Sequence, residues 1–153
     1  MRYITNRGNP PDELLSLDVK RSLAEMLNDK SGKPHKKVVA DLYKGGENKT
    51  VVKALLRLYN YKCSYCERYI HTAKEVEHYR PISKYFWLSY EWTNLLISCH
   101  ECNKASGGKG FQFPIGAKRK ISPPDNEKDY KINSVFLLEE KNIQQPGFLL
   151  QSR

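Results

Sequence analysis

The chain has 153 residues, a length that suits one domain with a hydrophobic core of moderate size. Its formal net charge of +9 and its mean hydropathy of −0.69 describe a basic, well-solvated protein. No apolar run approaches the roughly 20 residues that cross a bilayer, and the first residues lack the apolar stretch of a signal peptide. These properties exclude a membrane-spanning protein and predict a cytoplasmic one.

The basic residues gather in two tracts. Residues 30–62 hold nine Lys and Arg against two acidic residues, and residues 104–120 hold five Lys and Arg with no Asp or Glu. Such fields attract polyanions, so nucleic acid is the partner that the charge favours. From charge alone, a basic surface that is merely well solvated is an equal alternative.

Residues 1–60 are predicted to form an N-terminal helical region. Apolar side chains recur at helical spacing in three stretches, namely residues 14–27, 38–43 and 51–59. Glycine and proline interrupt the pattern at residues 31–34 and 45–46. We interpret the three apolar stripes as core and assign them no chemistry.

Four cysteines in two Cys-x-x-Cys pairs dominate the middle of the chain, residues 61–114. The pairs are Cys63 with Cys66 and Cys99 with Cys102. Zinc prefers four thiolate or imidazole ligands in a tetrahedron, and a two-residue spacer lets one turn present two thiolates to the same ion. In a reducing compartment such pairs are metal ligands more often than disulfides. We therefore predict one structural Cys₄ zinc site, in preference to four unrelated buried thiols or a redox pair.

The 32 residues between the two cysteine pairs contain a candidate catalytic tract. Glu75, Glu77 and His78 lie in an alternating stretch that predicts a strand, with the two carboxylates on one side and His78 on the other. Residues 92–98 predict a second strand, and residues 100–107 favour a helix. The expected fold class is therefore α+β, with a strand–loop–strand–helix unit pinned by zinc at both ends.

Three motifs in this region resemble those of the HNH endonuclease family. Residues 76–81, VEHYRP, are similar to the first motif, in which an acidic residue and a histidine are followed shortly by a proline. Asn94 matches the middle asparagine, and Asn103, directly after the last cysteine, matches the third motif in its zinc-knuckle form. The resemblance covers residues 63 to about 114 and implies a ββα-metal nuclease core. One departure is Glu77, because many members have aspartate there and the longer side chain must retract to place its oxygen.

The same residues suit the hydrolysis of a phosphodiester. Neutral His78 can accept a proton from water, while Glu77 and Asn103 offer hard oxygen ligands to Mg²⁺, with Mn²⁺ as an alternative ion. Asn94 is expected to hydrogen-bond the backbone and hold the loop that orients His78. The candidate phosphate contacts are Arg80, Lys104 and Lys109.

Other side chains of the region have plainer interpretations. His100 lies between two cysteines and could bind a second metal or a phosphate, but such a residue is more often only a helix-start side chain, so we leave it out of the site. Five aromatic residues could stack bases, although packing of the zinc core is the favoured interpretation: Tyr85, Phe86, Trp87, Tyr90 and Trp92.

A narrower resemblance extends to both flanks of the core. Residues 1–4, residues 10–14 and the KGFQFP sequence of residues 109–114 are similar to the HNH proteins of bacterial anti-phage systems, namely the Septu nuclease subunit and its retron-associated relatives. That resemblance implies an ABC-type ATPase as partner, and in retron relatives a reverse transcriptase with its RNA–DNA hybrid. It implies invading DNA or host tRNA as substrate. Such relatives continue beyond the point where this chain stops, so residues 115–153 are expected to be a basic linker and a shortened C-terminal segment.

Two alternatives to a nuclease in a defence complex remain open. The first is a stand-alone HNH nuclease of restriction type that has no ATPase. The second is a catalytically inactive zinc module that only binds nucleic acid. The sequence disfavours the second, because the positions of the base and of the metal ligands are all filled.

Overall fold

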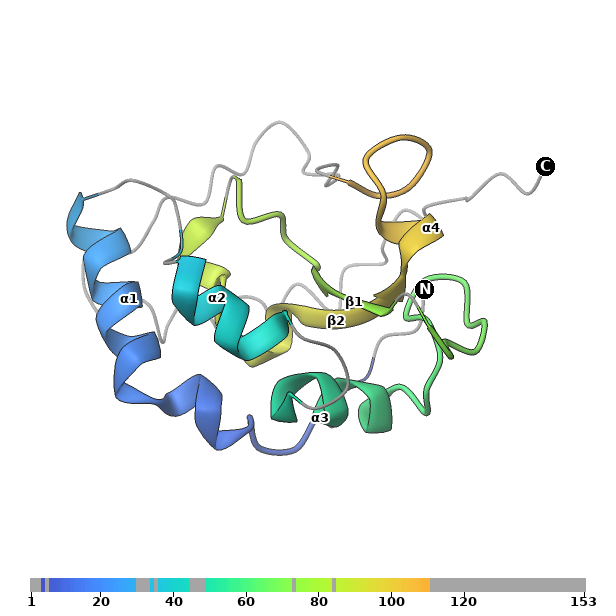
Figure 1. Cartoon of the computed structure of the whole chain (residues 1–153), viewed down its shortest axis with the longest axis horizontal. Helices are drawn as coiled ribbons and strands as arrows, with labels where there is room; N and C mark the ends of the chain where they lie inside the picture. The colour runs from blue at the N-terminus through green and yellow to red at the C-terminus, as the bar shows by residue number, and fades with distance from the viewer. Residues whose placement is uncertain are drawn as a thin grey trace.

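The computed structural model describes residues 4, 6–29, 34, 36–44, 49–72, 74–83 and 85–110. Within this part, helices surround a two-stranded antiparallel sheet, so the predicted α+β class is confirmed (Figure 1). The helices are η1 (Asp12–Leu15), α1 (Leu17–Asp29), α2 (Lys36–Tyr43), α3 (Thr50–Leu58), η3 (Phe86–Leu88), η4 (Trp92–Asn94) and α4 (His100–Asn103). The strands are β1 (Lys74–His78) and β2 (Leu95–Cys99). The predicted linker and C-terminal segment, residues 115–153, lie outside the described residues.

The three predicted helices of the N-terminal region are present as α1, α2 and α3. The first begins later than its apolar pattern suggests, because a separate 3₁₀ turn, η1, precedes it. Ser16 separates the two in an extended conformation, with φ −63° and ψ 157°. Its hydroxyl accepts a hydrogen bond from the Val19 N–H at 3.4 Å, which satisfies one of the free N–H groups that begin a helix.

The hydrophobic core is continuous between this helical region and the sheet. Helix α3 packs against β2, and Leu55 on the helix and Leu95 and Ile97 on the strand are completely buried. Each such side chain stabilises the fold by roughly 1.5–3 kcal/mol through removal of apolar surface from water. The helices therefore help to form the core on which the candidate site is built.

The sheet fixes which side chains face each other. Strand β1 pairs antiparallel with β2, so that Glu75 lies opposite Ser98 and Glu77 opposite Leu96. The second strand is shorter than predicted, because residues 92–94 form the 3₁₀ turn η4. The carboxylate of Glu91 accepts hydrogen bonds from the Thr93 N–H at 3.3 Å and hydroxyl at 3.0 Å, which stabilises that turn.

Helix α4 is also shorter than predicted, since it ends at Asn103 and not near Gly107. Gly107 has a φ of +80°, which turns the chain away from the helix. Gly108 then lies so close to the carbonyl oxygens of Lys104, Cys102 and Glu101 that a Cβ would be 2.6–2.9 Å from them. This close approach lets the chain fold back toward β1, with the Lys109 N–H donating to the Cys102 carbonyl at 2.8 Å.

A buried arginine ties the N-terminal segment to the sheet. The guanidinium of Arg7 donates to the Leu95 carbonyl at 2.5 Å and to the Tyr59 hydroxyl at 3.2 Å. It also lies 4.9 Å from the centre of the Trp92 ring, a cation–π distance.

The aromatic residues between the two strands pack in the interior of the protein. Tyr85, Trp87, Tyr90 and Trp92 are buried and Phe86 is half-buried.

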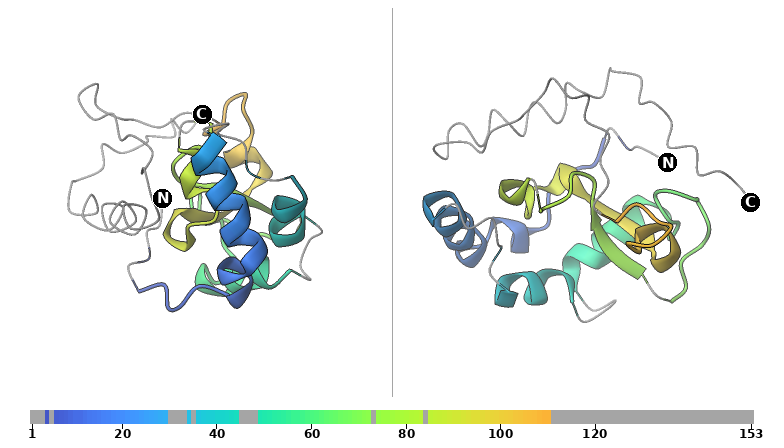
Figure 2. Two further views of the ribbon diagram at one scale, coloured as in Figure 1. Left: turned by 90° about the vertical axis from the view of Figure 1, so that its left-hand side faces the viewer. Right: turned by 90° about the horizontal axis from the view of Figure 1, so that it is seen from above.

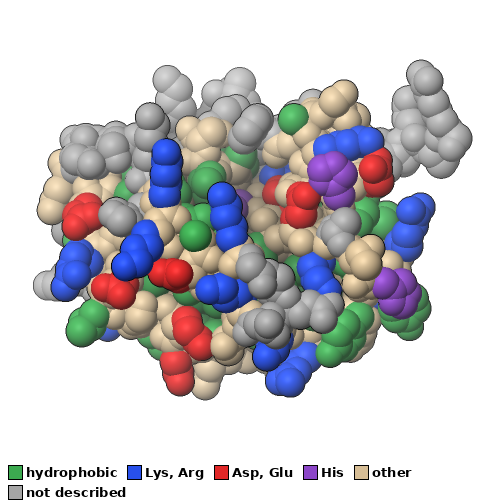
Figure 3. Space-filling view, in the orientation of Figure 1, with side chains coloured by type: hydrophobic (Ala, Val, Ile, Leu, Met, Phe, Trp, Pro, Cys, Tyr) green, Lys and Arg blue, Asp and Glu red, His purple; other side chains and the backbone are tan. Residues whose placement is uncertain are grey.

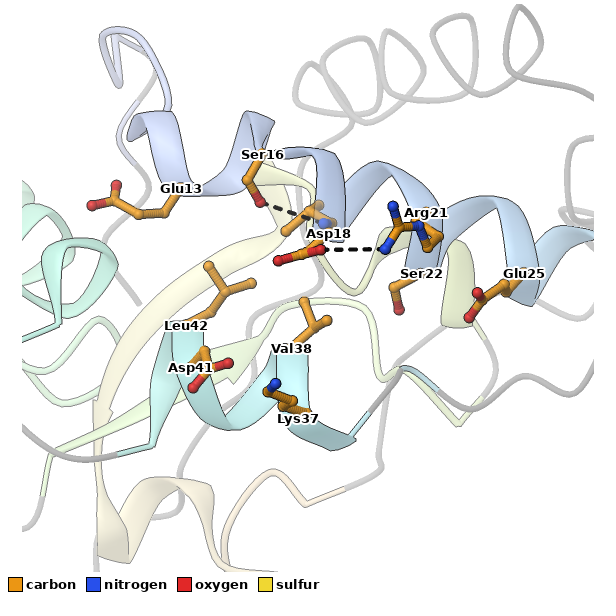
Figure 4. A pocket seen from close by; sticks show the side chains of 11 residues that line it. Glu13, Ser16, Asp18, Arg21, Ser22, Glu25, Lys37, Val38, Asp41 and Leu42 are labelled. Atoms are coloured by element: carbon orange, nitrogen blue, oxygen red, sulfur yellow. Dashed lines mark hydrogen bonds and ion pairs between the residues drawn. The ribbon is translucent and has the colours of Figure 1, made fainter.

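Figures 1 and 2 place α1 at one end of the described structure and α4 at the other. A groove of about 390 Å³ lies between η1, α1 and α2, lined by acidic, basic and apolar side chains (Figure 4). Acidic and basic side chains are interspersed over this end of the molecule (Figure 3). None of the described helices is both long and apolar enough to span a membrane.

Candidate active site

The four cysteines converge on one point. Their sulfur atoms all lie within 4.8 Å of one another, and the Sγ atoms of Cys66 and Cys99 are 3.9 Å apart. Four sulfur ligands at about 2.3 Å from a tetrahedral zinc ion lie about 3.8 Å from each other. The donor set and its spacing therefore fit zinc, and the prediction that both cysteine pairs share one metal site is confirmed.

Backbone hydrogen bonds bring the two cysteine pairs together. The first pair lies in a turn after α3, where the Ser64 N–H donates to the Ile97 carbonyl of β2 at 2.9 Å. The second pair spans the junction between β2 and α4, and the Cys99 N–H donates to Cys63 Sγ at 3.4 Å. Burial alone would raise the pKa of the Cys63 thiol, but backbone N–H groups lower it overall and favour the thiolate that binds metal.

The two faces of β1 carry different chemistry, as the alternation in the sequence predicts. The Glu75 and Glu77 side chains extend toward α4 and the loop that follows it, where each has a polar partner. His78 extends to the other side, where its ring meets the Tyr43 ring edge-on at a centroid distance of 5.8 Å. The candidate base and the candidate carboxylates therefore leave the strand in different directions.

His78 is held in one tautomer by a backbone carbonyl. Its Nε2 lies 2.9 Å from the Ser89 carbonyl oxygen. A carbonyl can only accept, so Nε2 carries the proton and Nδ1 carries the lone pair. The Tyr43 hydroxyl donates to the same carbonyl oxygen at 2.7 Å. Burial, with repulsion from Lys109, lowers the pKa of His78 to about 4, even though the Ser89 hydrogen bond acts in the opposite direction. The imidazole is therefore neutral at pH 7.

Asn94 is completely buried and binds the backbone on both sides of the loop that joins the two strands. Its Oδ1 accepts from the Arg80 N–H at 2.8 Å. Its Nδ2 donates to the carbonyls of Arg80, at 3.2 Å, and Leu88, at 3.1 Å. The sequence predicts backbone contacts of this kind for Asn94. They fix the chain immediately before Ser89, whose carbonyl holds His78.

Glu77 forms a buried ion pair with Lys109. The Lys109 ammonium contacts Glu77 Oε1 and donates to the His78 carbonyl at 2.8 Å. The two side chains are only 9% and 8% exposed. Burial raises the pKa of Glu77, although the ammonium of Lys109 opposes that rise. This position at the end of β1 thus combines a carboxylate with a cation in a poorly hydrated site.

Glu75 forms a second, more exposed cluster with α4. Its Oε1 lies 2.7 Å from His100 Nδ1, and its Oε2 accepts from Asn103 Nδ2 at 2.7 Å. Burial raises the pKa of Glu75, but the hydrogen bonds from His100 and Asn103 outweigh it and lower the pKa overall. The carboxylate is therefore ionised at neutral pH and acts only as an acceptor.

The oxygen atoms near β1 and α4 suit a small divalent cation. Glu75, Glu77 and Asn103 supply carboxylate and amide oxygens, the ligands that Mg²⁺ prefers. Within the described ranges, the cysteines are the one group of three or more His, Cys, Asp or Glu side chains that encloses a possible ion position. A magnesium ion would therefore keep several waters, which is its usual behaviour. The ammonium of Lys109 against Glu77 marks a place that favours positive charge.

The three predicted phosphate contacts differ in how exposed they are and in the partners that they already have. The Lys104 side chain is 39% exposed and pairs with Glu101 on α4. Arg80 is only 2% exposed, and its guanidinium lies 5.2 Å from the centre of the Tyr85 ring. This interior position gives no support to a phosphate contact by Arg80. Lys109 is engaged with Glu77 and could reach a phosphate only after leaving it.

Two residues of the site lie outside the sequence prediction. Tyr43, from the N-terminal helical region, contacts the His78 ring and shares its carbonyl acceptor. No local pattern in the sequence indicates this, because Tyr43 belongs to an ordinary apolar stripe 35 residues upstream. His100 is not part of the predicted site, yet its Nδ1 lies within hydrogen-bond distance of Glu75 Oε1. Antiparallel pairing of the two strands would have indicated that Glu75 lies near His100, since it places the start of β1 next to the end of β2.

Replacing Lys109 with methionine is expected to lower the free energy of unfolding by about 3 kcal/mol, because it leaves the buried Glu77 carboxylate without its counter-charge. Urea unfolding of the zinc-saturated protein measures the change. Lys104→Met is the matched control, since its partner Glu101 is exposed and such pairs contribute little to stability. Adding Glu77→Gln to Lys109→Met should recover much of the loss. Equal destabilisation by both lysine variants would contradict this assignment.

The comparisons with known proteins agree with this geometry. Residues 63–109 match the family model described as HNH endonuclease. Septu protein PtuB of Bacillus mycoides (strain KBAB4) is 36% identical over 84 residues, which cover 45% of this chain and 28% of the relative. Septu protein PtuB of Bacillus thuringiensis is 36% identical over 106 residues, which cover 66% of this chain and 35% of the relative.

The chain thus spans about a third of the length of the curated relatives it matches. No solved structure matches it. The matched segment begins at the first zinc-type cysteine and ends at Lys109, and it includes β1, β2 and α4. Residues 63–109 of this chain are therefore an HNH endonuclease domain.

Proposed function

We propose that the protein is a metal-dependent endonuclease that hydrolyses phosphodiester bonds of nucleic acid. In this proposal a permanent zinc ion at the four cysteines maintains the fold, and an exchangeable Mg²⁺ ion beside β1 supports the chemistry. The observation that carries the proposal is the agreement between family and geometry. The segment that matches the HNH endonuclease model is the same segment that holds a neutral histidine and two carboxylates at one strand, beside a metal-binding cysteine cluster.

His78 is the proposed general base. Because Nε2–H is bound to the Ser89 carbonyl, the lone pair at Nδ1 is the one that can accept a proton from an attacking water. The low pKa of His78 keeps this lone pair free throughout the physiological pH range. Asn94 supports the base indirectly, since it fixes the backbone just before Ser89. Tyr43 packs against the ring and limits its rotation.

Glu77 and Asn103 are the proposed ligands of Mg²⁺. When bound, such an ion polarises the scissile phosphate and stabilises charge on the leaving 3′-oxygen. Glu77 would then exchange the ammonium of Lys109 for the metal, and Lys109 would become available to a phosphate oxygen. Lys104, at the exposed end of α4, is the second proposed phosphate contact. Contacts of this kind supply charge but carry no sequence information.

We also propose that the nuclease acts in a cytoplasmic anti-phage complex with an ABC-type ATPase. Both curated relatives bear the name Septu, and the sequence resembles HNH subunits of such systems beyond the catalytic core. DNA is the proposed substrate, with tRNA as the alternative. A retron-type partner, a reverse transcriptase with its RNA–DNA hybrid, finds no support in the names of these relatives and is the less favoured arrangement.

Cleavage assays test the proposed activity. The zinc-loaded protein, alone and with an ATPase that co-purifies from its native host, is incubated with plasmid DNA and with tRNA, in Mg²⁺ and in EDTA. We expect cleavage of DNA in Mg²⁺ only. Cleavage without any ATPase would favour a stand-alone restriction-type nuclease. Binding of DNA or tRNA with no cleavage of either, even with the ATPase present, would establish an inactive zinc module and contradict the proposal.

A further inference from the structure

We propose that Glu75 is a positioning residue that orients the Asn103 side chain toward the catalytic metal, and that His100 supports Glu75 in this role. The inference rests on the proposed function, since it concerns a ligand of the proposed Mg²⁺ ion. It assigns a purpose to the cluster on α4 that the HNH motifs leave unexplained. Glu75 precedes the acidic residue of the motif by two positions, and His100 lies between two zinc-type cysteines.

The carboxylate of Glu75 joins β1 to α4 by both of its oxygens. Oε2 accepts from Asn103 Nδ2 at 2.7 Å, and Oε1 lies at 2.7 Å from His100 Nδ1. Each distance is at the short end of the range for a hydrogen bond. Two partners on two oxygens fix both the position of the carboxylate and its rotation.

This contact decides which end of the Asn103 amide faces Glu75. The Asn103 Nδ2 group donates to Glu75 Oε2, so the NH₂ end of the amide faces the carboxylate. The carbonyl oxygen of Asn103 is then turned away from Glu75. Of the two amide ends, only that oxygen can bind a metal cation. Glu75 therefore selects the rotamer in which Asn103 can act as a ligand.

His100 contributes by restraining the other oxygen of Glu75. Its side chain is 57% exposed, while that of Glu75 is 36% exposed. An exposed pair of this kind adds little to the stability of a protein. Its effect should therefore be seen in the site and not in the fold. Partners that orient a ligand typically change metal affinity or activity by roughly 10- to 100-fold when they are removed.

The test measures Mn²⁺ binding to the zinc-loaded protein by electron paramagnetic resonance, without nucleic acid. Glu75→Ala should weaken Mn²⁺ binding by at least about 10-fold. Glu75→Gln should lose much less, because its amide oxygen can still accept from Asn103. His100→Ala should have an intermediate effect. Glu101→Ala, which removes an exposed carboxylate from the same helix, is the matched control and should bind like the wild type.

A double-mutant comparison separates positioning from direct ligation. If Glu75 acts through Asn103, Glu75→Ala should cause no further loss of Mn²⁺ affinity in an Asn103→Ala background. The melting temperatures of the zinc-loaded variants should stay close to that of the wild type.

Two results would overturn the inference alone: wild-type Mn²⁺ affinity in Glu75→Ala, or an undiminished loss from Glu75→Ala when Asn103 is already absent. A wild-type protein that neither binds Mn²⁺ nor cleaves nucleic acid would overturn the proposed function, and this inference with it.

Discussion

Replacing Cys66 with serine is expected to abolish zinc binding and to unfold the HNH domain. The sulfur atoms of the two cysteine pairs converge from the turn after α3 and from the β2–α4 junction, so a zinc ion bound there would join these elements in addition to their hydrogen bonds. Structural zinc contributes about 10–16 kcal/mol of apparent binding energy in zinc-finger peptides, as much as the whole stability of a typical domain. Zinc content and the cooperativity of thermal unfolding measure the result.

Cys66 is a suitable position for this experiment because its side chain is exposed. Serine at that position creates no cavity in the core, so any loss of structure comes from the metal site. Glu67→Gln, an exposed neighbour in the same turn, is the control and should keep one zinc ion and the wild-type melting temperature. A Cys66→Ser protein that unfolds as cooperatively as the wild type would show that zinc does not maintain the fold.

Replacing His78 with alanine is expected to reduce the cleavage rate by about 10²- to 10⁴-fold, the usual contribution of a general base. The fold should survive, because the Ser89 carbonyl keeps the Tyr43 hydroxyl as a hydrogen-bond donor when the imidazole is removed. Single-turnover cleavage at saturating Mg²⁺ measures the rate, and thermal unfolding verifies the structure.

His71→Ala provides the matched histidine control, since that side chain is exposed and precedes β1. It should cleave at the wild-type rate. A rate for His78→Ala that equals that of His71→Ala would remove His78 from the mechanism. An unfolded His78→Ala protein would instead show that the histidine is structural.

The local parts of the fold could be predicted from the sequence because local rules determine them. The spacing of the cysteines predicts their shared site, and the alternation around Glu77 predicts a strand with two different faces. The sequence also predicts that the Asn94 amide hydrogen-bonds the backbone, and the amide does bind the backbone of Arg80. The predicted bounds of helices and strands differ from the observed ones, because a single contact can decide where such an element begins or ends. Ser16 caps α1 and delays its start, and Gly107, with a positive φ, turns the chain after α4.

The contacts between distant segments could not be predicted in the same way. Tyr43 reaches His78 because the N-terminal helices and the sheet share one core, a property of packing that no short motif records. Arg80 was expected at a phosphate, but it lies in the interior against Tyr85. The pairing of Lys109 with Glu77 depends on how the chain folds back after Gly108. The composition of the chain indicates that it has many charged side chains, but it does not indicate which of them form ion pairs.

The central claim is that zinc maintains the fold while a different ion, Mg²⁺, supports cleavage, and one sample can test it. The protein is desalted into magnesium-free buffer, its zinc content is measured, and cleavage of DNA, together with any ATPase that the activity requires, is followed before and after Mg²⁺ is added. We expect one zinc ion per chain, no cleavage at first, and full cleavage once Mg²⁺ is present. Full cleavage before Mg²⁺ is added, or an active protein that contains no zinc, would contradict the account.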